Sequence, residues 1–309
     1  MPFLPTVDGR ALKLSTVALR VHRFPRAKTA RVLALLTATL PVATLAATTN
    51  YVWDGNAPGG SGNSRWSRNS NWTNNMSPPA NSASGLTNID ITFAGRLKTS
   101  PLLDNSYFAR SLTFDPTAGA FSIVPQTAQT LTLGTGGIVN NSTNTQTIFS
   151  GINLRSSQTW NAAAGNLAIR GLVNLGANNL TLAGLRDIGI TNTIQGTGGL
   201  IKQGAGTLFL AGSTANTFSG GLTIEAGTVT VAKNNALGNG PLLMTGGVLN
   251  LGSFTFGVSS VSLLGGVINS TSGGLTSSSS YQLQSGTINS RLGGSGGLLK
   301  TTAGTVTLT

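Results

Sequence analysis

The chain of 309 residues contains no cysteine and only one histidine, His22. The lack of cysteine excludes disulfide bonds, a structural zinc site with thiolate ligands, and a thiol nucleophile. Because His22 is the only histidine, a Ser-His-Asp arrangement is excluded from the rest of the chain. The fold must therefore be held by packing and by backbone hydrogen bonds.

Charged side chains are also scarce, at 8% of residues against about 25% in an average soluble protein. Glycine is abundant, with 42 residues, and Ser, Thr and Asn fill much of the remainder. Leu, Val and Ile recur throughout, which is not a disordered composition. Many Gly, Thr, Asn and β-branched residues favour strands and tight turns over helices.

The amino-terminal segment differs from the rest in charge. It holds seven of the 19 Lys and Arg residues and one acid, Asp8, so the remainder carries +6 of the formal +12. The basic run Arg26–Arg31 precedes an apolar stretch, Val32–Ala46, which ends in small residues typical of a signal-peptidase site. That stretch is too short, and too interrupted by Thr and Pro41, for a membrane span. We therefore predict a signal peptide at residues 1–46, export to the extracellular space or outer-membrane surface, and no transmembrane segment.

Residues 47–100 form a second region, rich in Asn, Ser, Pro and Gly. It contains Trp53, Trp66 and Trp72 among turn-forming residues, and short strands such as Ile89–Phe93 are expected within it. A repeat array needs a distinct terminal cap, and we predict that these tryptophans provide one. The alternative is a platform on which sugars stack.

A short repeat runs through the last third of the chain. Its unit is Gly-x-aliphatic, and the units begin at Gly206, Gly227, Gly246, Gly265, Gly286 and Gly304. The intervals between them are 21, 19, 19, 21 and 18 residues, with a mean of 19.6. Alternation as in Thr228–Val231 places apolar side chains on one face of a strand. If each repeat makes one turn of three short strands, successive turns stack about 4.8 Å apart and enclose a continuous core. We therefore predict an all-β fold, a right-handed parallel β-helix of about 20 residues per coil over residues 101–309.

Competing repeat architectures fit less well. A leucine-rich horseshoe needs an L-x-x-L-x-L-x-x-N pattern, which is missing, and a β-sandwich gives irregular strand intervals. Calcium-binding β-rolls need G-G-x-G-x-D units, and no Asp follows GTGG or GSGG in this chain.

One stretch resembles a known family. Gly196–Val231, GTGGLIKQGAGTLFLAGSTANTFSGGLTIEAGTVTV, is similar to the autotransporter-associated β-strand repeat, and a second copy begins at Gly294 and is cut off at Thr309. The resemblance implies a pectin-lyase-like parallel β-helix that serves as a passenger, secreted or displayed at the surface of a bacterium. The matching residues are Gly198, Gly199, Leu200, Lys202, Gly204, Gly206, Thr207, Leu208, Leu210, Gly212, Asn216, Thr217, Gly220, Gly221, Ile224, Gly227 and Thr228.

Acidic side chains are too few and too scattered to indicate a catalytic site. Within the repeat region, only Asp187 and Glu225, 38 residues apart, are spaced so that they would stack two coils from each other. That separation, roughly 10 Å, is at the upper limit for an inverting pair of glycosidase carboxylates. We predict no catalytic, cofactor-binding or metal-binding residue, and no cofactor. After residue 46 the acids are Asp54, Asp90, Asp104, Asp115, Asp187 and Glu225.

Basic residues recur at repeat-related positions. Lys202 and Lys300 occupy equivalent places in the two copies, and we expect them on a solvated face of the coil that opposes edge-to-edge association. The alternative is a basic stripe that attracts anionic polysaccharide or lipid headgroups, made of these two residues with Arg155, Arg170, Arg186 and Lys233.

Together these features predict a non-enzymatic exported β-helix that acts as a stalk or an adhesive scaffold. The alternative is a carbohydrate-binding or carbohydrate-cleaving β-helix. The expected partners are surface glycans or anionic polysaccharide, and not nucleic acid, because the charge is sparse and dispersed. The last coil, with its apolar run Thr305–Leu308, is expected to expose an edge that can pair with another chain.

Overall fold

The computed structural model describes residues 48–56, 64–80, 88–212 and 214–309. The chain divides into two compact units, Met1–Leu45 and Ala46–Thr309. The predicted signal peptide lies outside the described residues, so the fold described below is that of the second unit.

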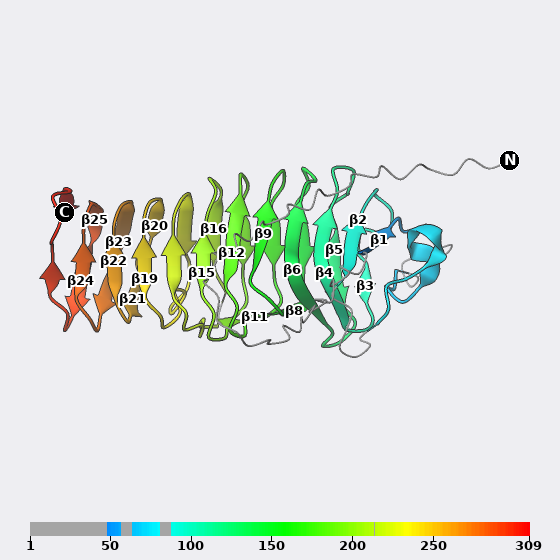
Figure 1. Cartoon of the computed structure of the whole chain (residues 1–309), viewed down its shortest axis with the longest axis horizontal. Helices are drawn as coiled ribbons and strands as arrows, with labels where there is room; N and C mark the ends of the chain where they lie inside the picture. Colours follow the sequence, from blue (N-terminus) through cyan, green and yellow to red (C-terminus); the bar gives the residue numbers. More distant parts are fainter. Residues whose placement is uncertain (1–47, 57–63, 81–87, 213) are drawn as a thin grey trace, which may run out of the picture. The chain divides into compact units, whose positions relative to one another are not determined.

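The described residues form a stack of parallel strands in two long sheets (Figure 1). Neighbours in each sheet come from successive turns of the chain, which is the arrangement expected of a solenoid. The larger sheet has 15 strands: β1 (Thr49–Trp53), β2 (Ile89–Phe93), β4 (Tyr107–Phe114), β6 (Thr130–Asn140), β8 (Gly151–Leu154), β9 (Gln158–Ala162), β11 (Val173–Asn174), β12 (Leu180–Gly184), β14 (Ile194–Gln195), β15 (Leu200–Lys202), β17 (Leu222–Ile224), β19 (Leu242–Met244), β22 (Val261–Leu263), β24 (Tyr281–Leu283) and β26 (Leu298–Leu299).

The second sheet lies on another side of the same coils. Its 12 strands are β3 (Leu102–Leu103), β5 (Ser122–Pro125), β7 (Gln146–Ile148), β10 (Leu167–Ile169), β13 (Ile188–Ile190), β16 (Thr207–Leu210), β18 (Thr228–Val231), β20 (Val248–Asn250), β21 (Thr255–Val258), β23 (Val267–Ser277), β25 (Gly286–Gly294) and β27 (Val306–Leu308).

The register between coils is regular over most of the stack. Trp160 pairs with Leu182, Leu182 with Lys202, and Lys202 with Ile224, so each step passes one turn of the chain. There are about ten turns of about 21 residues each. The predicted all-β parallel β-helix is thus confirmed, with a coil about one residue longer than expected.

The third side of the coil is less regular than the prediction of three strands per turn. Short strands β8, β11 and β14 lie there, and the long strands β6, β23 and β25 bend around a corner into it. Between β14 and β21, the described residues form no strand on this side. Asn216 replaces the missing ladder: its Oδ1 accepts from the backbone N of Ile194 at 2.9 Å, and its Nδ2 donates to the backbone O of Ala236 at 2.7 Å.

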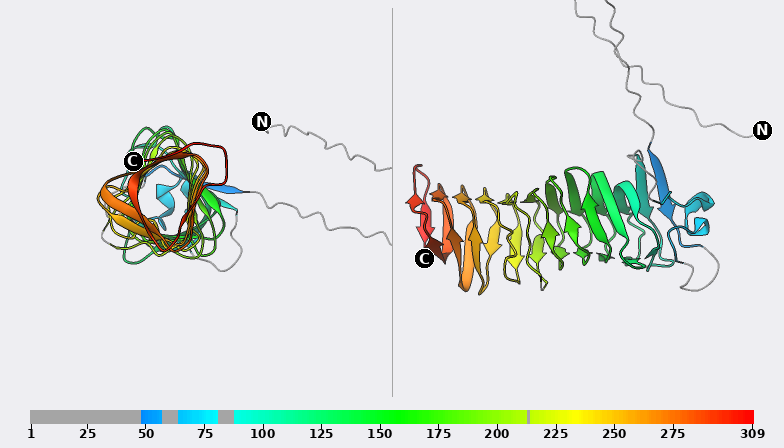
Figure 2. Two further views of the ribbon diagram at one scale, coloured as in Figure 1. Left: turned by 90° about the vertical axis from the view of Figure 1, so that its left-hand side faces the viewer. Right: turned by 90° about the horizontal axis from the view of Figure 1, so that it is seen from below.

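The interior is continuous along the axis, as the view down the stack indicates (Figure 2). In the repeat region it is mainly aliphatic, with like residues stacked on like in the row Leu200, Leu222 and Leu242. Toward the amino-terminal coils it becomes aromatic. Trp53, Trp66 and Trp72 are all buried there, as the predicted tryptophan cap requires.

The aromatic cluster is assembled from segments far apart in the sequence. Trp53 ends β1 and meets Trp72 edge-on at 5.2 Å between ring centroids, and Trp66 lies 5.1 Å from the ring of Tyr107 at the start of β4. Two short 3-10 helices, η2 (Asn69–Asn71) and η3 (Thr73–Asn75), flank Trp72. Its indole Nε1 donates to the backbone O of Trp66 at 2.7 Å. The polar edge of this large side chain is therefore satisfied inside the cluster.

Glycine at the corners allows the coils to approach closely. A Cβ placed on Gly206 would lie 2.0 Å from the backbone O of Arg186 in the preceding coil, a distance that no real side chain adopts. Gly227, at the equivalent corner one turn later, has a φ of 71°, which favours glycine. The repeated Gly-x-aliphatic unit therefore marks one corner of each coil, where the chain turns into the second sheet.

An asparagine ladder joins successive coils on the outer face of the second sheet. The Nδ2 of Asn269 donates to Oδ1 of Asn250 at 3.1 Å, and Nδ2 of Asn289 donates to Oδ1 of Asn269 at 2.9 Å. The ladder continues to the hydroxyl of Thr309, which donates to Asn289. Side-chain hydrogen bonds therefore reinforce the backbone ladder in this part of the stack.

Candidate functional site

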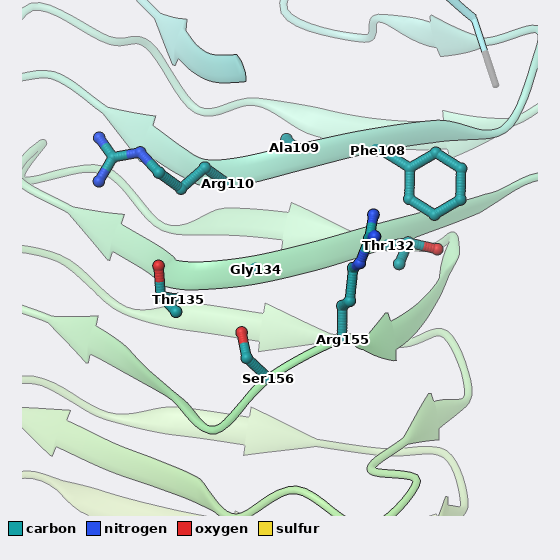
Figure 3. Close-up of a pocket in the computed structure, with 8 residues that line it drawn as sticks. All are labelled: Phe108, Ala109, Arg110, Thr132, Gly134, Thr135, Arg155 and Ser156. Atoms are coloured by element: carbon teal, nitrogen blue, oxygen red, sulfur yellow. The ribbon is translucent and has the colours of Figure 1, made fainter. Parts of the chain in front are cut away.

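A groove on the outer face of the larger sheet is lined by two arginines, Arg110 and Arg155 (Figure 3). Its volume is about 240 Å³. Three successive turns line it, and the residues are Phe108, Ala109 and Arg110 from β4, Thr132, Gly134 and Thr135 from β6, and Arg155 and Ser156 from the segment after β8.

The groove exists because the register between β4 and β6 is irregular. Ala109 pairs with Leu133, but Ser111 pairs with Gly137, so β6 holds extra residues at this point. Gly134 lies in that irregular stretch and has no side chain to fill the space between β4 and the segment after β8. A Cβ on Gly134 would lie 3.3 Å from the Cα of Arg110, so the floor approaches β4 closely.

The two arginines of the groove differ in their surroundings. Arg110 forms an ion pair with Asp90, whose carboxylate also accepts from the hydroxyl of Ser111. The hydrogen bond that Arg110 donates to Asp90 raises the pKa of Arg110 further above its usual value. The guanidinium of Arg155 instead lies over the ring of Phe108, 5.8 Å from its centroid, in the range of a cation–π contact. Figure 3 shows these groups at opposite ends of the groove, with Gly134 between them.

The lining offers groups that bind rather than groups that break bonds. Thr132, Thr135 and Ser156 contribute hydroxyls, and Arg155 contributes a charged, planar donor. The eight lining residues include no carboxylate and no histidine. Nor do the described residues contain a group of three or more His, Cys, Asp or Glu side chains that could hold a metal ion. The groove is therefore suited to an anionic or hydroxyl-rich ligand.

The two acids considered for catalysis lie two coils apart at the same corner, where the chain passes from the larger sheet to the second sheet. Asp187 directly precedes β13 in the second sheet, and its carboxylate accepts from the backbone N of Thr207 at 2.8 Å. Glu225 directly follows β17 in the larger sheet and accepts from Nε2 of Gln203 at 2.8 Å. Each acid is thus engaged with a neighbouring coil, and no hydrogen bond in the described part of the chain joins them.

Lys202 is not on a solvated face, so that prediction is wrong. Its side chain is only 3% exposed, because in β15 it follows Leu200 at an interval of two and shares the inward face. The ammonium donates to the backbone O of Gln203 at 2.6 Å and of Gly204 at 2.8 Å, and more weakly to Ala226. Burial lowers the pKa of Lys202 to about 8, against the opposing effect of the Asp187 carboxylate. Lys202 therefore stabilises the corner carbonyl groups of two coils.

Of the other two lysines in the predicted basic stripe, Lys300 is exposed and Lys233 is buried. Lys300 makes the same local contact as Lys202, donating to the carbonyl two residues later, at Thr302, but its side chain is exposed. Lys233 is buried, and its Nζ donates to Oδ1 of Asn216 at 3.0 Å. Burial lowers the pKa of Lys233 as well. The six-residue basic stripe does not form as a surface, because Lys202 and Lys233 are inside.

The other members of that stripe are exposed. Arg170 lies over the ring of Phe149 at 5.6 Å, a second arginine–phenylalanine pair that does not line the groove. Arg186 donates from Nε to the backbone O of Ala164 at 3.2 Å. Of the predicted basic residues, only Arg155 lies in the groove.

The three amino-terminal tryptophans cannot be a sugar platform, because their side chains are at most 1% exposed. Sequence reasoning did not identify Phe108 and Arg110. A usable signal was present, since Phe108 and Arg110 alternate with Tyr107 and Ala109, which face the core. Among the described residues, no helix has the length and apolar character needed to span a membrane.

Comparison with known proteins finds a repeat family that is similar to one part of the chain. Residues 200–231 match the passenger-associated-transport-repeat, which confirms the resemblance to a passenger repeat that the sequence indicated. A stretch of 76 residues is 45% identical to the adhesin BmaC autotransporter of Brucella suis biovar 1 (strain 1330). That stretch is 24% of this chain but 2% of the adhesin, so the similarity covers a small part of a much longer protein. No solved structure matches the chain.

Proposed function

We propose that this chain is a non-enzymatic, exported passenger that acts as an adhesive scaffold at the bacterial surface. The observation that carries the proposal is the passenger-associated-transport-repeat at residues 200–231, set within a continuous parallel solenoid. The similarity to an adhesin supports adhesion as the role, and the same family supports a secreted or outer-membrane location. In such a protein, the outer faces of the coils are the surface that a partner meets.

The geometry also favours binding over catalysis. Asp187 and Glu225 lie two coils apart, and each accepts a hydrogen bond from the coil between them, which disfavours the carbohydrate-cleaving alternative. The carbohydrate-binding alternative retains a specific observation in its favour, the groove that contains Arg155 and Phe108.

The adhesive function is tested by displaying the chain on a non-adherent bacterial host and counting the cells retained on host-cell monolayers and on plastic. We expect the wild type to increase retention over the empty anchor. Gly206→Ala, which places a Cβ against the backbone of the preceding coil, should lower the increase at equal surface amounts. Gly189→Ala is the matched control, because a Cβ there meets nothing within 4 Å.

Two outcomes would contradict the proposal. Wild-type chains that are folded and displayed but give no retention above the anchor would exclude an adhesive role on those surfaces. If limited proteolysis shows that the Gly206→Ala chain is unfolded and retention still equals that of the wild type, the retention comes from nonspecific binding of unfolded polypeptide and not from the solenoid.

A further inference from the structure

We propose that the groove between β4, β6 and the segment after β8 binds a carboxylated sugar unit of an acidic polysaccharide, with Arg155 holding the carboxylate. The inference rests on the proposed adhesive function for its biological setting, and it names the contact surface and the ligand class. It follows from the charge, the shape and the chemistry of the lining, taken in turn.

The charge of the groove is set by Arg155. The other arginine, Arg110, is already paired with Asp90. No carboxylate of the described residues lies within ion-pair distance of Arg155, and its side chain is exposed. A guanidinium presents two parallel N–H groups that match a carboxylate, and this bidentate pairing makes arginine the preferred residue for such a ligand.

The aromatic ring of Phe108 fits the other half of a sugar acid. A pyranose ring has an apolar C–H face, and aromatic side chains bury such faces. The Arg155 guanidinium lies 5.8 Å from the centre of the Phe108 ring. A sugar acid whose carboxylate is held by Arg155 therefore has its pyranose ring next to Phe108. The half-buried position of Phe108 fixes its orientation without hiding it from a ligand.

The remaining lining suits the hydroxyl groups of a sugar. Thr132, Thr135 and Ser156 bring three hydroxyls, each both a donor and an acceptor, to the floor and one wall. The volume of about 240 Å³ is below the ~300–1,000 Å³ of sites for drug-sized ligands. The groove therefore holds one sugar unit, and the neighbouring units of a polymer extend along the outside of the solenoid.

The second arginine–phenylalanine pair provides an internal control. Arg170 and Phe149 have nearly the same separation, 5.6 Å, but they are not among the residues that line the groove with its three hydroxyl groups. If binding needed only an exposed arginine on an aromatic ring, both pairs would bind equally. The inference assigns the ligand to the Arg155 pair alone.

The experiment titrates the chain with a uronic acid oligosaccharide, such as oligogalacturonate, and with its fully methyl-esterified form, by isothermal calorimetry at low and moderate salt. We expect the free acid to bind at least about tenfold more tightly than the ester, which lacks the charge. Arg155→Gln should weaken binding of the acid about tenfold or more. Arg155→Lys should weaken it by less, because lysine keeps the charge but lacks the two parallel N–H donors of the guanidinium. Arg170→Gln should leave the affinity unchanged.

A second variant tests the shape of the site. Thr132→Leu replaces a hydroxyl of the floor with a larger apolar group and should also weaken binding, without changing the net charge. Circular dichroism and thermal unfolding of each variant establish that the solenoid is intact, as expected for substitutions at groove positions outside the core.

Several results would overturn the inference. They are no binding of the free acid by the wild type, equal affinity for acid and ester, or equal losses for Arg155→Gln and Arg170→Gln, which would mean diffuse attraction. Competition by phosphate or by single-stranded DNA at equal charge concentration would identify a general anion patch and would also overturn it. Calorimetry is done in solution and does not depend on adhesion. If the oligosaccharide binds but the adhesion assay gives no retention, only the proposed function is contradicted.

Discussion

The amino-terminal coils and the repeat coils have similar backbones but different interiors. In the first, rings from distant segments interlock at varied angles, as where Trp66 meets Tyr107 at 5.1 Å. In the second, Leu200, Leu222 and Leu242 stack in register. A coil that is covered by a similar coil can fill most of its inward positions with aliphatic side chains stacked in rows. A coil that receives the long segment between β1 and β2 needs large, irregularly oriented side chains to fill its interior.

The strongest test of this contrast is Trp66→Ala. Removing a fully buried indole from the aromatic cluster should lower the free energy of unfolding by about 3–5 kcal/mol. Phe209→Ala, at an aromatic residue that is 41% exposed in the repeat coils, should change it by less than about 1 kcal/mol. Urea titrations followed by circular dichroism measure both. Similar small losses at the two positions would mean that the aromatic cluster does not stabilise its coils.

A weaker effect is expected where the repeat coils depend on glycine. Gly206→Ala should destabilise the chain by roughly 1–3 kcal/mol, because the new Cβ forces the coil away from the backbone of Arg186. Gly189→Ala, on a strand with free space around it, should stay within about 0.5 kcal/mol of the wild type. Thermal unfolding of the two variants compares them directly. If Gly189→Ala were as damaging as Gly206→Ala, close approach of the coils would not be the reason for the corner glycines.

The smallest expected effect concerns Lys202 and depends on pH. Burial lowers its pKa in the folded chain from 10.5 to about 8, so above pH 8 the unfolded chain holds a proton that the folded chain has released. Stability contributed by this group therefore rises with pH from about 8, by at most ~1.4 kcal/mol per pH unit. Below pH 8 the lysine is charged in both states and contributes no slope.

The measurement compares urea unfolding of the wild type, Lys202→Met and Lys300→Met between about pH 7 and 9. Lys202→Met should show a smaller rise in stability than the wild type, whereas Lys300→Met should show the same rise, because Lys300 is exposed. Buried Lys233 titrates in all three chains, so the difference between the curves isolates Lys202. A rise in Lys202→Met as steep as that of the wild type would contradict the lowered pKa of Lys202.

Much of the fold was predictable because the repeats are explicit. The Gly-x-aliphatic unit and the alternation in Thr228–Val231 were sufficient to predict parallel coils of about 20 residues. The position of Lys202 was predictable in principle, because it follows Leu200 at an interval of two and so faces inward. The charge of Lys202 by itself indicates a solvated position, but in this strand the side-chain period determines the direction of the side chain.

The groove was less accessible to sequence reasoning. It joins Phe108, Gly134 and Arg155, which belong to three turns whose spacing departs from the repeat. The irregular register between β4 and β6 creates the space of the groove. No short sequence pattern in either strand predicts such an irregularity. Long-range packing among segments of unequal length determines it instead.

The unequal steps between coils have a broader consequence. Lys202 to Ile224 spans 22 residues and Ile224 to Met244 spans 20, yet both steps keep the strands aligned. The extra residues lie in the segments that connect the strands, so the strands keep their register. New peptide can therefore be spliced into a bend without disturbing the winding. Chains of this design can diversify what they display while inheriting an unchanged frame.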